Sequence, residues 1–162
     1  MKALRSCPLF AGMSEIEIDL TLGNISYQLV SLPSHEVYAL AGMPCKYVDI
    51  VVSGKLICRM AALSGKQVEV SRLHSGNMVA PAFIFSKDRS LPVSVETDGK
   101  VQLFRMRPEE LKRLIDLDET LRMNYIRILS NIDVFLTQKM KVLSLFTVRE
   151  KVAYLLMERA GE

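Results

Sequence analysis

Two apolar stripes run along residues 118–143, a stretch that contains no Pro or Gly. One stripe repeats in steps of four and three residues, which is the spacing of a coiled-coil seam, and the other lies on a neighbouring face. A helix that is apolar on two faces must bury both of them. We expect one face to pair with the same helix of a second chain and the other to cover the chain's own upstream domain. The predicted dimer interface contains Leu121, Tyr125, Ile128, Ile132, Phe135 and Val142.

A single core helix in a monomer would also explain these two stripes, but the length of the seam favours the homodimer. Lys139 occupies the one seam position that is not apolar. The second stripe contains Ile126, Leu129, Leu136, Met140 and Leu143.

Upstream of this helix, residues 26–106 form short apolar runs that are separated by turn residues. Ser64-Gly65-Lys66 predicts a hairpin, and Gly54 and Asp98-Gly99 predict two further turns. Seven or eight short strands at this spacing indicate an all-β barrel or sandwich.

Three shorter helices are predicted around the strands. Ser14 and Glu17 form a capping box at the start of the first, whose apolar face is expected to hold Ile16, Leu20 and Leu22. Pro108, followed by two glutamates in the first turn, starts the second. The third begins near residue 147, with an apolar face of Val148, Val152, Leu155 and Leu156.

Composition and charge restrict the function classes only loosely. The 162 residues are 49% apolar and 24% charged, with a net charge of +3, which is too small to indicate nucleic-acid binding by itself. No apolar run is long enough to cross a membrane and the first residues do not form a signal peptide, so we expect a cytoplasmic protein without a membrane partner. Cys7, Cys45 and Cys58 form no CxxC pair, which argues against a zinc site or a cysteine-bound cluster.

Three segments and the long helix together resemble the cyclic-AMP receptor protein/FNR (CRP/FNR) family of bacterial transcription regulators. The segments are PLFAGMSEIEI at 8–18, VDIVVSGKLICRM at 48–60 and QVEVSRLHSGNMVAPAFIF at 67–85. The resemblance implies a mainly β fold with α elements, in which a cyclic-nucleotide-binding-like β-roll (jelly roll) precedes a long dimerisation helix.

The resemblance also implies the domain organisation and the partners. Residues 1–117 would hold the N-terminal helix and the effector-sensing roll, 118–146 the dimerisation helix, and 147–162 the hinge and the start of a truncated winged helix-turn-helix domain. Such regulators are homodimers that bind promoter DNA through that C-terminal domain, which this chain is expected to have largely lost.

The chain departs from the family pattern where members that bind cyclic nucleotides hold the ribose and the phosphate. Their Gly-Glu pair reads Ala80-Pro81 here, and their Arg-Ser pair reads Leu91-Pro92. Arg suits phosphate because its guanidinium can bind two oxygens at once. Arg89-Ser90 lies two residues early, so only a shifted loop could present it. We therefore expect an apolar pocket that does not bind cyclic AMP.

The chain also lacks the N-terminal cysteine cluster of the FNR branch, since only Cys7 lies near its start. It looks most similar to the hybrid-cluster-protein regulators (HcpR), which implies haem-dependent sensing of nitric oxide and nitrosative stress. An apolar pocket suits a porphyrin. The pocket carried over from the family consists of Ala80, Pro81, Ala82, Leu91, Pro92, Val93, Leu136 and Thr137.

The candidate axial ligands for haem are His74, Cys58 and Met140, and each also has a plain structural explanation. His74 lies in a predicted surface turn, whereas Cys58 and Met140 could simply pack in the core. Two other functions were weighed. A metal-dependent enzyme of the cupin type needs a His/Glu cluster that two scattered histidines cannot supply, so we expect no enzyme. A structural dimerisation module with a filled roll, or a sensor of another small apolar ligand, remains the alternative.

Overall fold

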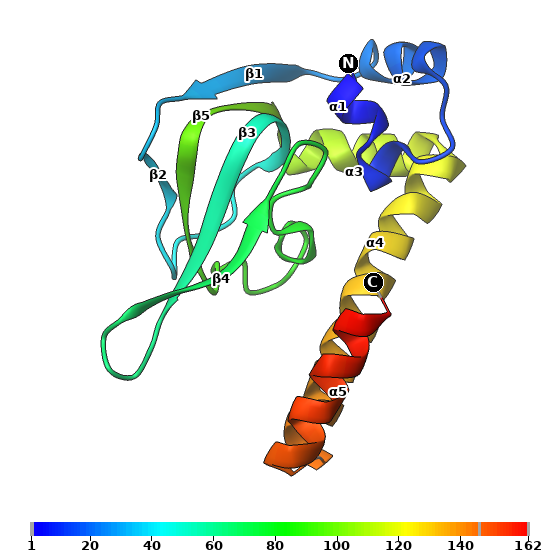
Figure 1. Cartoon of the computed structure of the whole chain (residues 1–162). Helices are drawn as coiled ribbons and strands as arrows, with labels where there is room; N and C mark the ends of the chain where they lie inside the picture. The colour runs from blue at the N-terminus through cyan, green and yellow to red at the C-terminus, as the bar shows by residue number, and fades with distance from the viewer. Residues whose placement is uncertain (1, 146, 162) are drawn as a thin grey trace. The chain divides into compact units, whose positions relative to one another are not determined.

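Five antiparallel strands form one sheet in the computed structural model, which describes residues 2–145 and 147–161. The hydrogen-bonded order is β1-β5-β3-β4, and β2 also pairs with β5. Figure 1 shows the sheet curling into a roll. The predicted mainly β fold followed by a long helix is confirmed. The strands are β1 Tyr27–Leu32, β2 Val37–Ala39, β3 Val48–Ala61, β4 Gln67–Leu73 and β5 Ser94–Met106.

Two of the turns predicted from glycine are wrong, because Gly54 and Gly99 lie inside β3 and β5. Both glycines have positive φ, and the pairing of the two strands shifts register on either side of Ser53. A Cβ on Gly54 would lie 2.3 Å from the carbonyl oxygen of Lys100, so the two backbones approach as closely as they do only because Gly54 has no side chain. Such irregularities bend long strands, so β3 and β5 each take the place of two shorter strands.

The hairpin between β3 and β4 is confirmed. Its turn is closed by the hydrogen bond from Ala62 N to Lys66 O at 2.8 Å and by that from Gly65 N to Ala62 O at 2.8 Å. The described residues form five strands and not the seven or eight expected, and residues 74–79 contribute only an isolated bridge between Met78 and Ile50.

The helices follow the predicted start signals. Both Ser14 with Glu17 and Thr147 with Glu150 form complete capping boxes. The apolar face predicted for the helix that follows Ser14 is wrong at two positions, because Ile16 and Leu20 are exposed while Ile18 and Leu22 are buried. The helices and turns are α1 Lys2–Arg5, η1 Pro8–Phe10, α2 Glu15–Leu22, η2 Pro81–Phe83, α3 Pro108–Leu117, α4 Glu119–Leu145 and α5 Val148–Ala160.

The chain divides into two compact units, Met1–Ile128 and Leu129–Glu162. The first contains the roll, α1 to α3 and the first turns of α4. The second contains the remainder of α4 together with α5. The 27 residues of α4 correspond to a helix about 40 Å long.

A buried ion pair joins three strands at the centre of the first unit. Asp49 on β3 is fully buried, and the Arg105 guanidinium on β5 donates to both of its carboxylate oxygens, from Nε and Nη2 at 2.8 Å each. The Tyr38 hydroxyl on β2 donates to the same carboxylate at 2.5 Å. Burial and the adjacent Asp49 raise the pKa of Tyr38, which keeps its proton in place. The Arg105 guanidinium also lies 4.2 Å from the centre of the Tyr47 ring.

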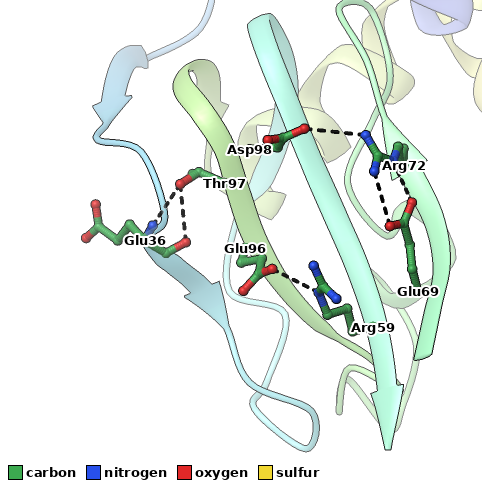
Figure 2. Close-up of polar contacts among 7 residues, drawn as sticks. All are labelled: Glu36, Arg59, Glu69, Arg72, Glu96, Thr97 and Asp98. Atoms are coloured by element: carbon green, nitrogen blue, oxygen red, sulfur yellow. Dashed lines mark hydrogen bonds and ion pairs between the residues drawn. The ribbon is translucent and has the colours of Figure 1, made fainter. Parts of the chain in front are cut away.

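A second set of ion pairs lies on an exposed part of the same sheet, as Figure 2 shows. Arg59 contacts Glu96 at 2.8 Å, and Arg72 contacts Glu69 at 2.5 Å and Asp98 at 3.4 Å. All five side chains are between 34% and 43% exposed, so water screens these pairs and each stabilises the fold by at most about 1 kcal/mol. We assign them a structural role in holding the hairpin against β5.

The buried and the exposed ion pairs predict losses of stability of different size for matched substitutions. Arg105→Met leaves Asp49 buried and unpaired, so we expect the free energy of unfolding to fall by about 3–5 kcal/mol. Arg59→Met leaves a half-exposed Glu96 in water and should cost less than about 1 kcal/mol. Urea denaturation of both variants provides the measurement, and equal losses would contradict the central role of Asp49.

Candidate effector site

Six of the eight predicted pocket residues lie in one segment after β4, residues 76–93, called the cassette below. Its first part hangs on β3 through backbone hydrogen bonds. Val51 N donates to Asn77 O at 2.9 Å, and Val79 N donates to Asp49 O at 2.9 Å. The buried carboxylate of Asp49 and the backbone that carries the cassette therefore belong to the same residue.

Two tight backbone positions shape this first part. Gly76 has φ of +90°, and a Cβ there would lie 2.5 Å from the Ser6 hydroxyl oxygen. Ala80 adopts the left-handed conformation, with φ 45° and ψ 51°, and leads directly into the 3₁₀ turn Pro81–Phe83. Left-handed backbone costs a residue with a Cβ roughly 1–2 kcal/mol. The resemblance places a glycine at this position, and glycine adopts the left-handed conformation without this cost.

The second part of the cassette is clamped to residues 42–45. Gly42 N donates to Leu91 O at 2.8 Å, Leu91 N donates to Met43 O at 2.9 Å, and Cys45 N donates to Arg89 O at 2.8 Å. These bonds fix the register of the loop and bury the Leu91 side chain to 5% exposure. Leu91 and not Arg89 is held in this place, so the loop shift that would present Arg89-Ser90 does not occur in the described residues.

The charges of the cassette stay on its exposed loop. The Asp88 carboxylate accepts a hydrogen bond from Ser90 N at 2.9 Å, and this bond lowers the pKa of Asp88. Burial raises the pKa of the Cys45 thiol, with Asp49 adding to the effect and Arg89 opposing it. Residues 80–85 and 91–93 contain no ionisable side chain. The wall that would meet a ligand is therefore uncharged.

The interior of the roll behind this wall is well filled. Ala80 and Val93 pack against a buried cluster that consists of Val51, Leu56, Cys58, Val79, Val95, Val101 and Leu103. Beside it lies a cavity of about 170 Å³, lined in part by Tyr38, Cys45, Leu91 and Arg105. Pockets for drug-sized ligands usually measure about 300–1,000 Å³. The cavity inside the roll is therefore too small for a porphyrin.

The predicted pocket residues differ widely in exposure. Leu91 is buried, Ala80, Pro81 and Val93 are half-buried, and Ala82 and Pro92 are exposed. Leu136 and Thr137 belong to the second compact unit, where both are exposed.

Of the candidate axial ligands, Cys58 does not suit the role, because its side chain is buried among the aliphatic residues of the roll. His74 is exposed, and its backbone N–H donates to Asn77 Oδ1 at 2.8 Å. Met140 is 66% exposed, so core packing is not the explanation for it. Among the described residues, no group of three or more His, Cys, Asp or Glu side chains could hold a metal ion.

The predicted dimer interface needs correction at three positions. Leu121 and Tyr125 are buried within their own chain in the first unit, and Val142 is buried within its own chain where α4 and α5 line a cavity of about 300 Å³. These side chains cannot also contact a partner in this conformation. Ile128 and Ile132 are half-buried and Phe135 is exposed, so the middle of the seam stays open.

Sequence reasoning missed the contacts of the first turns of α4. Asn124 is buried and its Nδ2 donates to the carbonyls of Leu9 and Ala11, at 2.9 Å each. The Tyr125 hydroxyl donates to Pro81 O at 2.8 Å. An Asn between apolar seam positions is the one sequence signal that could have marked this stretch as internal.

This arrangement, an antiparallel roll with a cassette after its fourth strand and helices at its end, defines the class of regulatory β-roll domains. Residues 29–118 match the family model described as "Cyclic nucleotide-binding domain". The chain belongs to the cyclic nucleotide-binding domain family. No curated protein matches the chain. None of the described helices is long and apolar enough to cross a membrane.

Solved structures with the same fold include several transcriptional regulators. A transcriptional regulator from Thermotoga maritima has a TM-score of 0.72 at 19% identity, over 80% of this chain and 98% of that one. Catabolite Activator Protein from Thermus thermophilus has a TM-score of 0.73 at 20% identity, over 85% of this chain and 63% of that one. The sensor domain of the transcriptional regulator DNR from Pseudomonas aeruginosa has a TM-score of 0.67 at 20% identity, over 91% and 93%.

The absence of ionisable side chains at residues 80–85 and 91–93 predicts that this member of the family does not bind cyclic AMP. A phosphate transferred to a wall of Ala80, Pro81, Leu91 and Pro92 would lose its hydration without gaining a charged partner. Titration calorimetry with cyclic AMP should give only heats of dilution. Saturable binding at a ratio of one per chain would contradict this prediction.

Proposed function

We propose that the chain is the effector-sensing and dimerisation region of a bacterial CRP/FNR-type transcription regulator that does not respond to cyclic AMP. The observation that carries the proposal is the cassette, which keeps the family backbone but is apolar where a nucleotide phosphate would bind. The structural neighbours support a regulator rather than an enzyme. Promoter DNA would be bound by a separate C-terminal domain.

Dimerisation would use the middle of α4. Of the predicted seam, Ile128 and Ile132 are half-buried and Phe135 is 56% exposed. Apolar side chains gathered on one helix are a usual mark of an interface. The Lys139 ammonium lies over the Phe135 ring, 4.8 Å from its centre.

For the effector we propose haem, with nitric oxide as the signal, on the basis of the resemblance to the hybrid-cluster-protein regulators. When bound, haem would supply an iron centre to which nitric oxide binds. The roll interior and Cys58 do not suit it. The assignment of the exposed residues Ala82, Pro92 and Leu136 to haem rests on the resemblance alone. His74 or Met140 would supply the axial ligand.

The filled interior of the roll favours a second candidate function. A domain with a cavity of about 170 Å³ beside the cassette could serve as a structural dimerisation module without an effector, or as the sensor of a small apolar molecule.

Dimerisation predicts that charge in the open part of the seam separates the chains. The double substitution Ile128→Asp and Phe135→Asp would bury unpaired carboxylates and should give monomers in sedimentation at micromolar concentration, where the unmodified chain is dimeric. Val134→Asp, on the same helix outside the seam, is the matched control and should remain dimeric. A monomeric unmodified chain would refute the proposal.

Haem binding predicts that haemin added under reducing conditions produces a Soret band whose absorbance saturates at one haem per chain. Leu136→Glu should weaken uptake roughly tenfold or more, because a carboxylate would be desolvated beside the porphyrin. Val134→Glu controls for the added charge. Replacing whichever of His74 and Met140 is the axial ligand should shift the Soret band. Uptake that is insensitive to Leu136→Glu would place the site elsewhere, and no uptake would favour the structural module.

A further inference from the structure

The first turns of α4 are anchored inside the first compact unit. Leu121 is fully buried, and Asn124 is 4% exposed with both amide hydrogens donated to backbone carbonyls of Leu9 and Ala11. Breaking these bonds would leave buried polar groups unpaired, which is costly. The base of α4 is therefore held in one position relative to the N-terminal segment.

Tyr125 connects this anchored base to the cassette. Its hydroxyl donates to Pro81 O at 2.8 Å, and its ring meets Phe85 edge-on, with 5.9 Å between ring centres and 88° between planes. Burial raises the pKa of Tyr125 to about 12, with Cys45 as a lesser cause. The hydroxyl thus keeps its proton, and remains a donor, throughout the pH range in which the protein would act.

The acceptor lies at the most constrained point of the cassette. Pro81 opens the 3₁₀ turn directly after the left-handed Ala80, and Phe83 N donates to Ala80 O at 3.0 Å within that turn. The turn is short and tight, so it moves as a unit. Any displacement of it must either break the bond to Tyr125 or move the base of α4.

We propose that Tyr125 is the positioning residue through which the cassette controls the base of α4, instead of a dimer contact. This inference rests on the proposed function, because it concerns how a signal at the cassette reaches the dimer helix. The hydroxyl bond carries the coupling, and the edge-on contact with Phe85 keeps the ring aimed at the turn. Coupling of this kind requires a continuous physical contact between the two elements, and the hydrogen bond from the Tyr125 hydroxyl to Pro81 O is that contact.

The test is hydrogen exchange of the whole chain, followed by mass spectrometry. Tyr125→Phe removes only the hydroxyl, so amides of residues 82–85 and 121–128 should both exchange about tenfold faster. Tyr27→Phe is the matched control, because Tyr27 is half exposed and its ring stacks on Phe104 without needing the hydroxyl. It should leave both segments unchanged. Unchanged exchange in Tyr125→Phe, or a change in only one segment, would overturn the proposal.

A double-mutant cycle separates this inference from the proposed function. In the chain that keeps Tyr125, the double substitution Ile128→Asp and Phe135→Asp should alter the hydrogen exchange of residues 82–85. In Tyr125→Phe, the same double substitution should leave that exchange unchanged. An effect that persists without the hydroxyl would overturn the coupling role. If the unmodified chain is monomeric and takes up no haem, the proposed function fails, whereas joint loosening of 82–85 and 121–128 in Tyr125→Phe would still support the link.

Discussion

The buried carboxylate of Asp49 is the constraint on which the rest of the first unit depends. A buried charge must be paired, and here one carboxylate uses Arg105 from β5 and Tyr38 from β2. The same residue accepts the backbone hydrogen bond from Val79 that fixes the start of the cassette. The requirement to satisfy one charge thus fixes the spacing of three strands and the origin of the segment that would meet an effector.

This frame explains how the ligand chemistry could change without loss of the fold. The bonds that shape the cassette are made by backbone atoms of Val51, Val79 and Leu91, and they do not depend on the side chains that would contact a ligand. Even the left-handed bend survives with Ala80 in place of a glycine. Side-chain changes at positions 81 and 91 therefore leave these backbone bonds of the scaffold in place.

The elements that sequence could predict are those whose signal is local. The capping box of Ser14 and Glu17 and the hairpin turn at Gly65 depend on neighbours within a few residues, and both are confirmed. Gly54 and Gly99 were misread as turns because positive φ serves bulges as well as turns, and only the facing strand decides between them. The cassette's apolar character could likewise be predicted, whereas the pairing of Asp49 could not, since its partners are more than ten residues away.

Contacts with residues distant in the sequence leave no local signal, which also explains why the whole apolar stripe on α4 was predicted to meet a single partner. Spacing of four and three residues states that a face must be covered but not by what. In the structure, Tyr125 is covered by the cassette, Val142 is buried within the second unit, and Phe135 is open. One apolar stripe thus serves both the interior and an exposed seam. The covered and the open residues of the stripe are only a few helical turns apart in the sequence, so spacing alone cannot tell them apart.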